Sequence, residues 1–439
     1  MTSIARAEYD RLPYPTVIVV GGGFGGLEVV QRLNGKPFKV LLIDKQNHHC
    51  FQPLLYQVAT ASLSADSIAH PFRRTVAPMT NVAFRMAGVT GIDPVGKHVH
   101  TDRGSFGYDI LILATGSTTN FFGNAAVEAE AMQLKSIAQA LDIRSDFLQD
   151  FEAAIFSDDE AAQRRQLNFV IVGGGPTGVE LAGAMAEIRM TVLKREYREV
   201  LSDRMQIHLI DSGVRLLKSF HPENSARAQR YLEKMGVHVR LGYRVLNFDG
   251  DRITLQDGST IDTNTVMWAA GVKGSSVSGL GNALDERSGR FKVDAFNAVE
   301  GHKDIYAVGD IALMTAEAAW PSGHPQVAPA AIQQAQCLVK NLLARSAGGE
   351  MTPFTYFDKG SMATIGRYKA VVEVRSLRFG GAIAWLGWIF VHVMSLVSFR
   401  NRIMVLMNWA WKFMSWKNTI RLIIRPYVRH TQQGSPAKS

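Results

Sequence analysis

The fold follows from the stretch Val17-Ile18-Val19-Val20-Gly21-Gly22-Gly23-Phe24-Gly25-Gly26, in which a β-branched run leads into a glycine-rich turn. The spacing G-x-G-x-x-G between a strand and a helix is typical of dinucleotide-binding folds. Gly21 permits the tight turn, Gly23 lets the backbone approach a pyrophosphate, and Gly26 lets helix and strand pack closely. The free N–H groups at the start of the helix, beginning near Phe24, then bind the phosphate anion.

The same pattern returns at Phe169-Val170-Ile171-Val172-Gly173-Gly174-Gly175-Pro176-Thr177-Gly178. After each turn a second strand ends in an acidic residue, Asp44 or Asp211, where such modules hold a ribose hydroxyl. Later strands lead into Ala114-Thr115-Gly116 and Ala269-Ala270-Gly271. Because the whole pattern recurs about 150 residues on, we predict two copies of one βαβ module and two bound dinucleotides.

The expected fold class is α/β, with two Rossmann-like domains and a helical C-terminal region. The strand before Gly309-Asp310 is expected to return the chain to the first module. We therefore predict a discontinuous FAD-binding domain (1–130 and 290–352), an NADH-binding domain (131–289) that includes a helical linker, and a region (353–439) of flavin-lid strands and membrane-anchoring helices.

The two sites are expected to take different nucleotides. A late carboxylate such as Asp310 can hydrogen-bond the ribityl hydroxyls of FAD, which favours FAD at the first turn. Asp211 favours NADH at the second, because a carboxylate repels a 2′-phosphate, although Arg215 and Lys218 lie close enough to weaken that preference. Glu180 is either an acid stabilised by the helix dipole or a contact to the nicotinamide or flavin edge.

The basic excess of the chain sits in its tail. The net charge is +9, yet residues 374–439 hold ten Lys and Arg, no Asp or Glu, and five of the seven tryptophans. This composition favours an anionic bilayer surface over nucleic acid, because apolar runs separate the charges. Residues 380–399 are long enough to span a bilayer, and Arg400–Arg425 reads as an interfacial amphipathic helix; packing of both on the protein itself or on a second copy is the alternative.

The cysteines and the N-terminus exclude some functions. Cys50 and Cys337 form no C-x-x-C, which argues against a disulfide framework and a redox-active dithiol. Residues 1–15 contain no apolar signal region, so we expect the cytosol or a membrane face that looks onto it.

The segment Asn47-His48-His49, Phe51-Gln52-Pro53-Leu54-Leu55-Tyr56-Gln57-Val58-Ala59 resembles the signature of type II NADH dehydrogenases, the single-subunit NADH:quinone oxidoreductases. The resemblance extends over nearly the whole chain, through the second glycine turn with Glu180, Tyr306–Asp310, Asp358–Gly366, and the tail around Trp385, His392, Arg400–Arg402 and Trp409.

This resemblance implies a flavin ring near Gln52, Pro53, Leu54 and Lys359. It implies a quinone tunnel along Val327–Gln334, with Gln333 as a quinone contact and Glu180 and Lys359 as further catalytic candidates. Many relatives carry Gln where this chain has Pro329, so that contact does not carry over. The implied reaction is NADH oxidation through non-covalent FAD with two-electron reduction of a membrane quinone, without proton pumping and without a metal. The implied setting is the cytoplasmic face of the cell membrane, with a homodimer as the assembly.

Three alternatives remain open from the residues alone. A sulfide:quinone oxidoreductase shares the fold but needs paired redox cysteines. A soluble ferredoxin or disulfide reductase does not need the tail. A non-enzymatic, redox-sensing flavoprotein would use the apolar tail as a partner interface.

Overall fold

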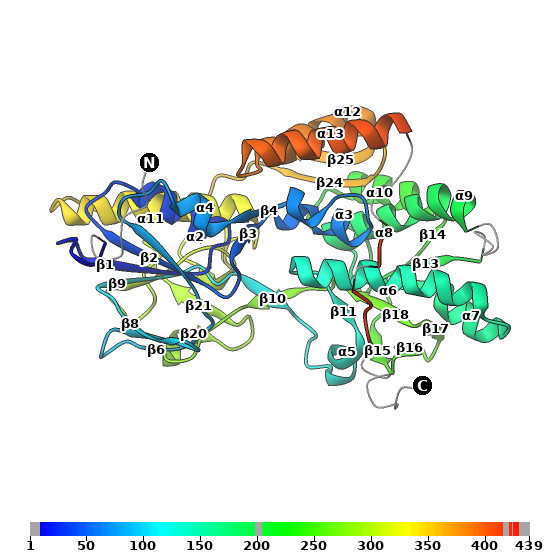
Figure 1. The fold of residues 1–439 in the computed structure, drawn as a ribbon, viewed down its shortest axis with the longest axis horizontal. Helices are drawn as coiled ribbons and strands as arrows, with labels where there is room; N and C mark the ends of the chain where they lie inside the picture. Colours follow the sequence, from blue (N-terminus) through cyan, green and yellow to red (C-terminus); the bar gives the residue numbers. More distant parts are fainter. Residues whose placement is uncertain (1–8, 198–203, 416–420, 424, 430–439) are drawn as a thin grey trace. The chain divides into compact units, whose positions relative to one another are not determined.

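The computed structural model describes residues 9–197, 204–415, 421–423 and 425–429. The chain divides into two compact units (Figure 1). Unit 1 is Met1–Cys50, Ala69–Thr118 and Val272–Lys359; unit 2 is Phe51–Ile68, Thr119–Gly271 and Gly360–Ser439. These boundaries differ from the predicted ones at 130 and 290, and the motif after Cys50 lies in unit 2 rather than with the first module.

Unit 1 is built on a five-stranded parallel sheet, and its strands are apolar because both faces are covered. Val17 and Val19 pack towards the helices, whereas Ile18 and Val20 pack towards smaller antiparallel sheets on the other face. The sheet runs β22 (Ile305–Ala307), β9 (Ile110–Leu113), β1 (Thr16–Val20), β2 (Lys39–Asp44) and β5 (Val82–Met86), and the helices are α2 (Phe24–Leu33) and α11 (Ala328–Ser346).

The smaller elements of unit 1 complete its second face and its loops. One antiparallel sheet is β6 (Val89–Asp93), β7 (His98–Thr101) and β8 (Gly104–Gly107); another sheet is β20 (Leu284–Asp285), β21 (Arg290–Val293) and β23 (Ala312–Met314). Strand β3 (His48–Cys50) pairs with β4 (Ala69–Pro71), which leads into α4 (Phe72–Val76).

Unit 2 repeats this architecture strand for strand. Its five-stranded parallel sheet runs β11 (Met132–Gln133), β18 (Thr265–Trp268), β12 (Asn168–Val172), β13 (Gln206–Asp211) and β14 (Val237–Leu241). A three-stranded antiparallel sheet follows, formed by β15 (Val245–Phe248), β16 (Arg252–Leu255) and β17 (Thr260–Asp262), as β6–β8 follows in unit 1. The predicted internal repeat is therefore confirmed. The remaining pairing joins β10 (Ser117–Thr119) to β19 (Val272–Gly274).

Two helices of unit 2 begin at side chains that cap them. Ser136 and Gln139 form a reciprocal capping box at the start of α6 (Ile137–Phe156), and Asp159 caps α7 (Glu160–Leu167). The unit also contains α3 (Leu55–Ala59), α5 (Ala125–Glu130), α8 (Pro176–Ile188), a π-helical turn (Arg189–Leu193), α9 (Lys194–Glu196) and α10 (Pro222–Lys234).

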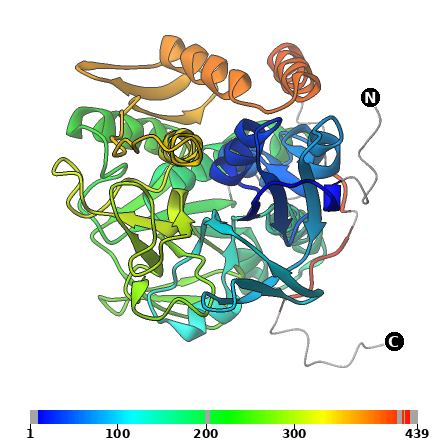
Figure 2. The ribbon, with the colours of Figure 1, turned by 90° about the vertical axis from the view of Figure 1, so that its left-hand side faces the viewer.

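The C-terminal part of unit 2 is an antiparallel sheet followed by two helices (Figures 1 and 2). The elements are β24 (Ser361–Gly366), β25 (Lys369–Val374), β26 (Leu377–Gly380), α12 (Ala382–Met394) and α13 (Phe399–Ser415). Helix α8 approaches β24 closely, since a Cβ at Gly183 would lie 1.8 Å from the carbonyl oxygen of Ile365. Among the described residues, no helix is both long enough and apolar enough to cross a bilayer.

Large apolar side chains of the two helices face outward. Leu406, Met407 and Trp411 of α13 are exposed, as are Ile383, Leu386 and Phe390 of α12. The buried residues of α13 include both the polar Asn401 and the apolar Val405. Residues 416–420 of the predicted amphipathic helix lie outside the described residues.

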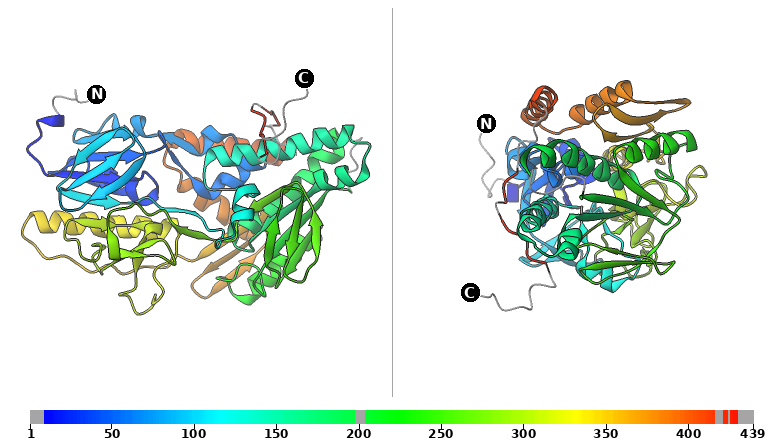
Figure 3. Two further views of the ribbon diagram at one scale, coloured as in Figure 1. Left: turned by 90° about the horizontal axis from the view of Figure 1, so that it is seen from below. Right: turned by 90° about the vertical axis from the view of Figure 1, so that its right-hand side faces the viewer.

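Three arginines near the end of the described chain form ion pairs within unit 2. Arg421 pairs with Glu196 of α9 at 2.8 Å, Arg425 pairs with Asp142, and Arg429 lies between two buried carboxylates of α6. Residues 425–429 lie beside α6 (Figure 3). The contact of the basic tail with a lipid surface stays a prediction.

Candidate functional site

The first glycine turn has the geometry of a phosphate cradle. Gly21 adopts φ +97°, and a Cβ at Gly26 would lie 1.8 Å from the Gly21 carbonyl oxygen, so neither position accepts a side chain. A Cβ at Gly23 would meet nothing within 4 Å, which leaves open space where the backbone starts α2 at Phe24. His49 closes the turn from behind, with Nδ1 3.0 Å from the Gly22 carbonyl oxygen.

The second turn reproduces this cradle in unit 2. Gly173 adopts φ +118°, a Cβ at Gly178 would lie 1.8 Å from its carbonyl oxygen, and Gly175 faces open space. Pro176 begins α8, a position where its missing N–H costs no hydrogen bond, and Thr177 follows in the first turn. Both cradles therefore present open helix N-termini to an anion.

Asp44 and Asp211 hold equivalent places beside the two cradles. One oxygen of Asp44 accepts from the Gly22 N–H at 2.6 Å, and one oxygen of Asp211 accepts from the Gly174 N–H at 2.6 Å. The other oxygen of each accepts from the N–H two residues on, at 2.7 Å. Burial raises the pKa of Asp44 from its usual value, and the backbone N–H groups oppose that shift.

The ends of the neighbouring strands close each cradle. A Cβ at Gly21 would lie 2.3 Å from the Ala114 carbonyl oxygen, and a Cβ at Gly173 would lie 2.5 Å from that of Ala269, just before Ala270 and Gly271. In unit 1 the buried hydroxyl of Thr115, next to Gly116, has no partner among the described residues.

The Gly-Asp turn lies in unit 1 as predicted. Gly309 adopts φ +75°, which glycine tolerates without strain, and a 3₁₀ turn follows. One oxygen of Asp310 accepts from the Ser117 hydroxyl at 2.6 Å. Ser117 follows the Ala-Thr-Gly strand end, and it escaped the sequence reasoning because hydroxyl residues are common in such loops.

The remaining flavin candidates fall into both units. Gln52, Pro53 and Leu54 form a 3₁₀ turn in unit 2, immediately before α3. Lys359 is exposed at the end of unit 1. Their joint contact with a flavin ring stays a prediction.

Glu180 is buried in unit 2, where its carboxyl group faces the Thr364 N–H and the Trp388 indole. It projects from the first half of α8, its side chain is buried, and its Oε1 lies 3.4 Å from the Thr364 N–H of β24. Burial raises its pKa to about 8, and the neighbouring Thr364 N–H and Trp388 indole oppose that rise only in part. At neutral pH this carboxyl group therefore holds a proton.

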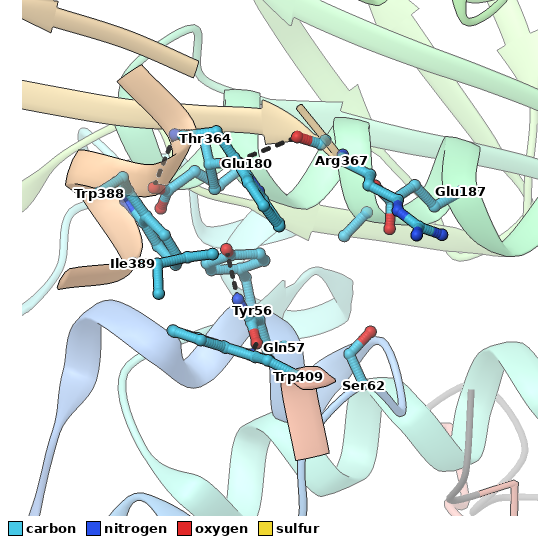
Figure 4. A pocket seen from close by; sticks show the side chains of 13 residues that line it. Tyr56, Gln57, Ser62, Glu180, Glu187, Thr364, Arg367, Trp388, Ile389 and Trp409 are labelled. Carbon is cyan, nitrogen blue, oxygen red and sulfur yellow. Dashed lines mark hydrogen bonds between the residues drawn. The ribbon is translucent and has the colours of Figure 1, made fainter. Parts of the chain in front are cut away.

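Glu180 lines a pocket within unit 2 (Figure 4). The other lining residues come from α3 and its loop, α8, β24 and its turn, and the two C-terminal helices: Tyr56, Gln57, Ser62, Ala184, Glu187, Thr364, Gly366, Arg367, Trp385, Trp388, Ile389 and Trp409. The pocket thus combines an aromatic wall of one tyrosine and three tryptophans with polar side chains, among them the carboxyl groups of Glu180 and Glu187.

Hydrogen bonds and ring contacts hold the aromatic wall in place. The indole N–H of Trp409 donates to Gln57 Oε1 at 2.8 Å, and Gln57 Nε2 donates to the Tyr56 hydroxyl at 2.8 Å. The Trp388 ring lies 5.6 Å from that of Trp409 and stacks on His392 at 4.1 Å. Burial lowers the pKa of His392 to about 4. In the sequence, the tryptophan-rich tail and the motif that contains Tyr56 and Gln57 were the signals for this wall.

Helix α11 places its two adjacent glutamines differently. Gln333 exchanges two hydrogen bonds of 3.0 Å with the backbone of Phe357, so both ends of its amide are engaged within unit 1. Gln334, which sequence reasoning passed over, is buried and accepts from the Gly309 N–H at 2.7 Å. Pro329 lies in the first turn of α11, where a helix tolerates it.

Comparison with known proteins decides the family. The family described as "Pyridine nucleotide-disulphide oxidoreductase" matches residues 15–335, and "NDH2 C-terminal domain" matches residues 359–422. Type II NADH:quinone oxidoreductase Ndh of Mycobacterium tuberculosis is 37% identical over 419 residues, covering 91% of this chain and 88% of that protein. The chain belongs to the type II NADH:quinone oxidoreductases. NdhA of the same organism is also 37% identical, over 91% of this chain and 87% of its own.

Solved structures agree with this family on the fold. NDH2 from Plasmodium falciparum in complex with NADH is 20% identical, covers 94% of this chain and 100% of its own, and has a TM-score of 0.86. The sulfide:quinone oxidoreductase from Aquifex aeolicus is 17% identical, the match covers 94% of this chain and 99% of that one, and the TM-score is 0.69. At these identities the likeness concerns the fold alone. Cys50 and Cys337 are free, and burial raises the pKa of Cys50 to about 12, which makes it a poor redox thiol.

Proposed function

We propose that this type II NADH:quinone oxidoreductase binds FAD non-covalently in unit 1, receives NADH in unit 2, and reduces a membrane quinone without pumping protons. The observation that carries the proposal is the pair of equivalent cradles, Gly21–Gly26 and Gly173–Gly178, each with a carboxylate beside it. Two dinucleotide sites in one chain fit electron transfer from a nicotinamide to a flavin.

The residues of unit 1 fit FAD. The open face of Gly23 admits a pyrophosphate, Asp44 is placed for a ribose, and Asp310 with Ser117 is placed for ribityl hydroxyls. The partnerless buried hydroxyl of Thr115 is available to a further polar ligand atom. When bound, the isoalloxazine ring accepts a hydride from NADH and passes two electrons on; the protein supplies position and excludes water.

The second site favours NADH over NADPH. The Asp211 carboxylate repels a 2′-phosphate. The guanidinium of Arg215 donates to the backbone carbonyls of Phe220 (2.9 Å) and Lys218 (2.8 Å), so it is not free to bind that phosphate.

The aromatic pocket of unit 2 is proposed to receive the quinone ring. Trp388 and Trp409 offer flat apolar surfaces, and the Tyr56 hydroxyl accepts from Gln57 while keeping its own proton to donate to a quinone oxygen. Reduction of a quinone to a quinol takes up two protons, and the protonated Glu180 supplies one of them at the pocket wall. Gln333 and Lys359 stay candidate contacts from unit 1.

The exposed apolar face of α12 and α13 is proposed to rest in one leaflet of the membrane, on its cytoplasmic side. Phe390 is 67% exposed and Met407 is 67% exposed, which is unusual for large apolar side chains unless a partner covers them. A quinone dissolved in the bilayer then reaches the pocket lined by the same two helices. A homodimer stays a prediction.

Stopped-flow absorbance of the bound flavin tests the proposal. We expect NADH to bleach the flavin faster than NADPH, and a short-chain quinone to restore its absorbance. In Glu180→Gln the NADH step is retained, while reoxidation slows by about 10²-fold or more because the amide releases no proton. A flavin that NADH does not bleach would refute the enzyme and favour a redox-sensing flavoprotein.

A further inference from the structure

A buried hydrogen-bond chain in unit 1 leads from the Gly-Asp turn to a carboxylate near the surface. The Gly309 N–H donates to Gln334 Oε1 at 2.7 Å, and Gln334 Nε2 lies 3.3 Å from His324 Nδ1. His324 Nε2 lies 2.9 Å from Glu317 Oε2, which also accepts from the Tyr356 N–H at 3.0 Å. None of these side chains belongs to the cofactor contacts described above.

Only one assignment of donors and acceptors satisfies every hydrogen bond from Glu317 to Gly309. The Glu317 carboxylate accepts hydrogen bonds, so His324 carries its proton on Nε2. In the singly protonated ring Nδ1 is then an acceptor, which faces the amide NH₂ of Gln334. The amide oxygen is left to accept from Gly309, whereas a flipped amide would set NH₂ against the Gly309 N–H.

The surrounding side chains fix the orientation of the His324 imidazole. Its side chain is 1% exposed and it lies among aromatic rings, with centroids 5.2 Å from Phe354, 5.7 Å from Tyr356 and 6.3 Å from Trp320. The Arg290 guanidinium lies 3.3 Å from the His324 carbonyl oxygen and contributes the other charged group beside this segment.

Gly309 controls the direction of Asp310, because it turns the chain through φ +75° immediately before it. Within the described part of the chain the Gly309 N–H donates to Gln334, so the orientation of the Gln334 amide determines whether this donor is satisfied. The Asp310 carboxylate in turn accepts a hydrogen bond from the Ser117 hydroxyl.

We propose that His324 is a positioning residue for the flavin site: its Nδ1 holds the Gln334 amide in the orientation that anchors Gly309 and so aims the Asp310 carboxylate. The inference rests on the proposed flavin function. It assigns no contact between His324 and the cofactor, and it makes Glu317 the group that selects the proton position on the ring.

Two isosteric substitutions separate this role from simple packing. Asn places its side-chain oxygen near the position of Nδ1, whereas Gln reaches the position of Nε2, and both remove the imidazole from the aromatic surround. We expect His324→Asn to keep the FAD dissociation constant of the holoenzyme within about threefold of wild type. We expect His324→Gln to raise it by about tenfold, the loss of one hydrogen bond to a buried donor.

Hydrogen exchange of the backbone at 305–311 gives a readout that does not depend on turnover. His324→Gln should accelerate exchange at Gly309, and His324→Asn should leave it near wild type. Equal FAD affinity and equal exchange in the two variants would overturn the proposal. If neither variant folds, Gln334→Glu (acceptor kept) and Gln334→Leu (acceptor lost) make the same comparison. An enzyme that anchors Gly309 as stated but does not reduce quinone with NADH would refute the proposed function alone.

Discussion

Replacing Glu180 by Gln probes a proton that the folded protein holds at neutral pH. Burial raises the pKa of this carboxyl group from 4.5 to about 8, so the folded state binds the proton more tightly than the unfolded state. The contribution of this group to the free energy of unfolding is therefore fully present below pH 4.5, and it is lost as the pH rises from 4.5 to about 8. Gln has nearly the same shape and no such ionisation, so the variant escapes this loss.

The size of the effect follows from the two pKa values. Each pKa unit corresponds to about 1.36 kcal/mol. Linkage then gives a cost of about 1 kcal/mol at pH 5 and about 3 kcal/mol at pH 7 in the wild type. For a unit of this size, about 2–4 °C in Tm per kcal/mol predicts that the Tm advantage of Glu180→Gln grows by about 4–8 °C between these pH values.

Thermal unfolding of the FAD-loaded enzyme at pH 5, 6, 7 and 8 measures this growth. Glu350→Gln is the matched control, because Glu350 is exposed and its substitution should leave a difference that does not change with pH. A constant Tm difference between wild type and Glu180→Gln across the series would show that the carboxyl group is already ionised when buried. The proton supply proposed for the quinone would then be wrong.

Three further outcomes are expected. The double variant Leu386→Ser/Phe390→Ser should abolish flotation with anionic liposomes while NADH still reduces a water-soluble acceptor. The control Val214→Ser, at a residue 89% exposed, should keep both flotation and acceptor reduction. Unchanged flotation of the double variant would exclude this helix face as the membrane contact. Asp211→Asn should lower the NADH-to-NADPH ratio of kcat/KM by about tenfold, because the repulsion of the 2′-phosphate is lost; a constant ratio contradicts this. Arg429→Met should lower Tm more at pH 8 than at pH 5.5. Burial raises the pKa of Asp150 to about 7, so at pH 8 this residue is a second negative charge beside Asp146, and the variant lacks the cation that pairs with both. Equal losses of Tm at the two pH values would argue against this ion pairing.

The two cradles were predictable because their requirements are local. A tight turn at Gly21 and a close approach at Gly26 are steric demands met within a few residues, and so they are written into the spacing of the glycines. The acidic residues that end β2 and β13 follow from the register of adjacent parallel strands.

The aromatic pocket of unit 2 and the charge pairs of the tail were not predictable in this way. Tyr56, Glu180, Thr364 and Trp409 are distant in sequence, and no short pattern relates them. In the sequence Arg429 is one of ten basic residues of the tail, and only the fold places it against two carboxylates of α6 from which water is excluded.

The sequence by itself determined two dinucleotide modules, their order, and the family, because backbone sterics around glycine act over a few residues. Only the tertiary structure decided that large apolar side chains of α12 and α13 face outward, that residues 425–429 lie beside α6, and that burial raises the pKa of Glu180. The physical reason is burial: the cost of placing a charge or an apolar ring depends on what surrounds it, and those neighbours come from segments hundreds of residues away.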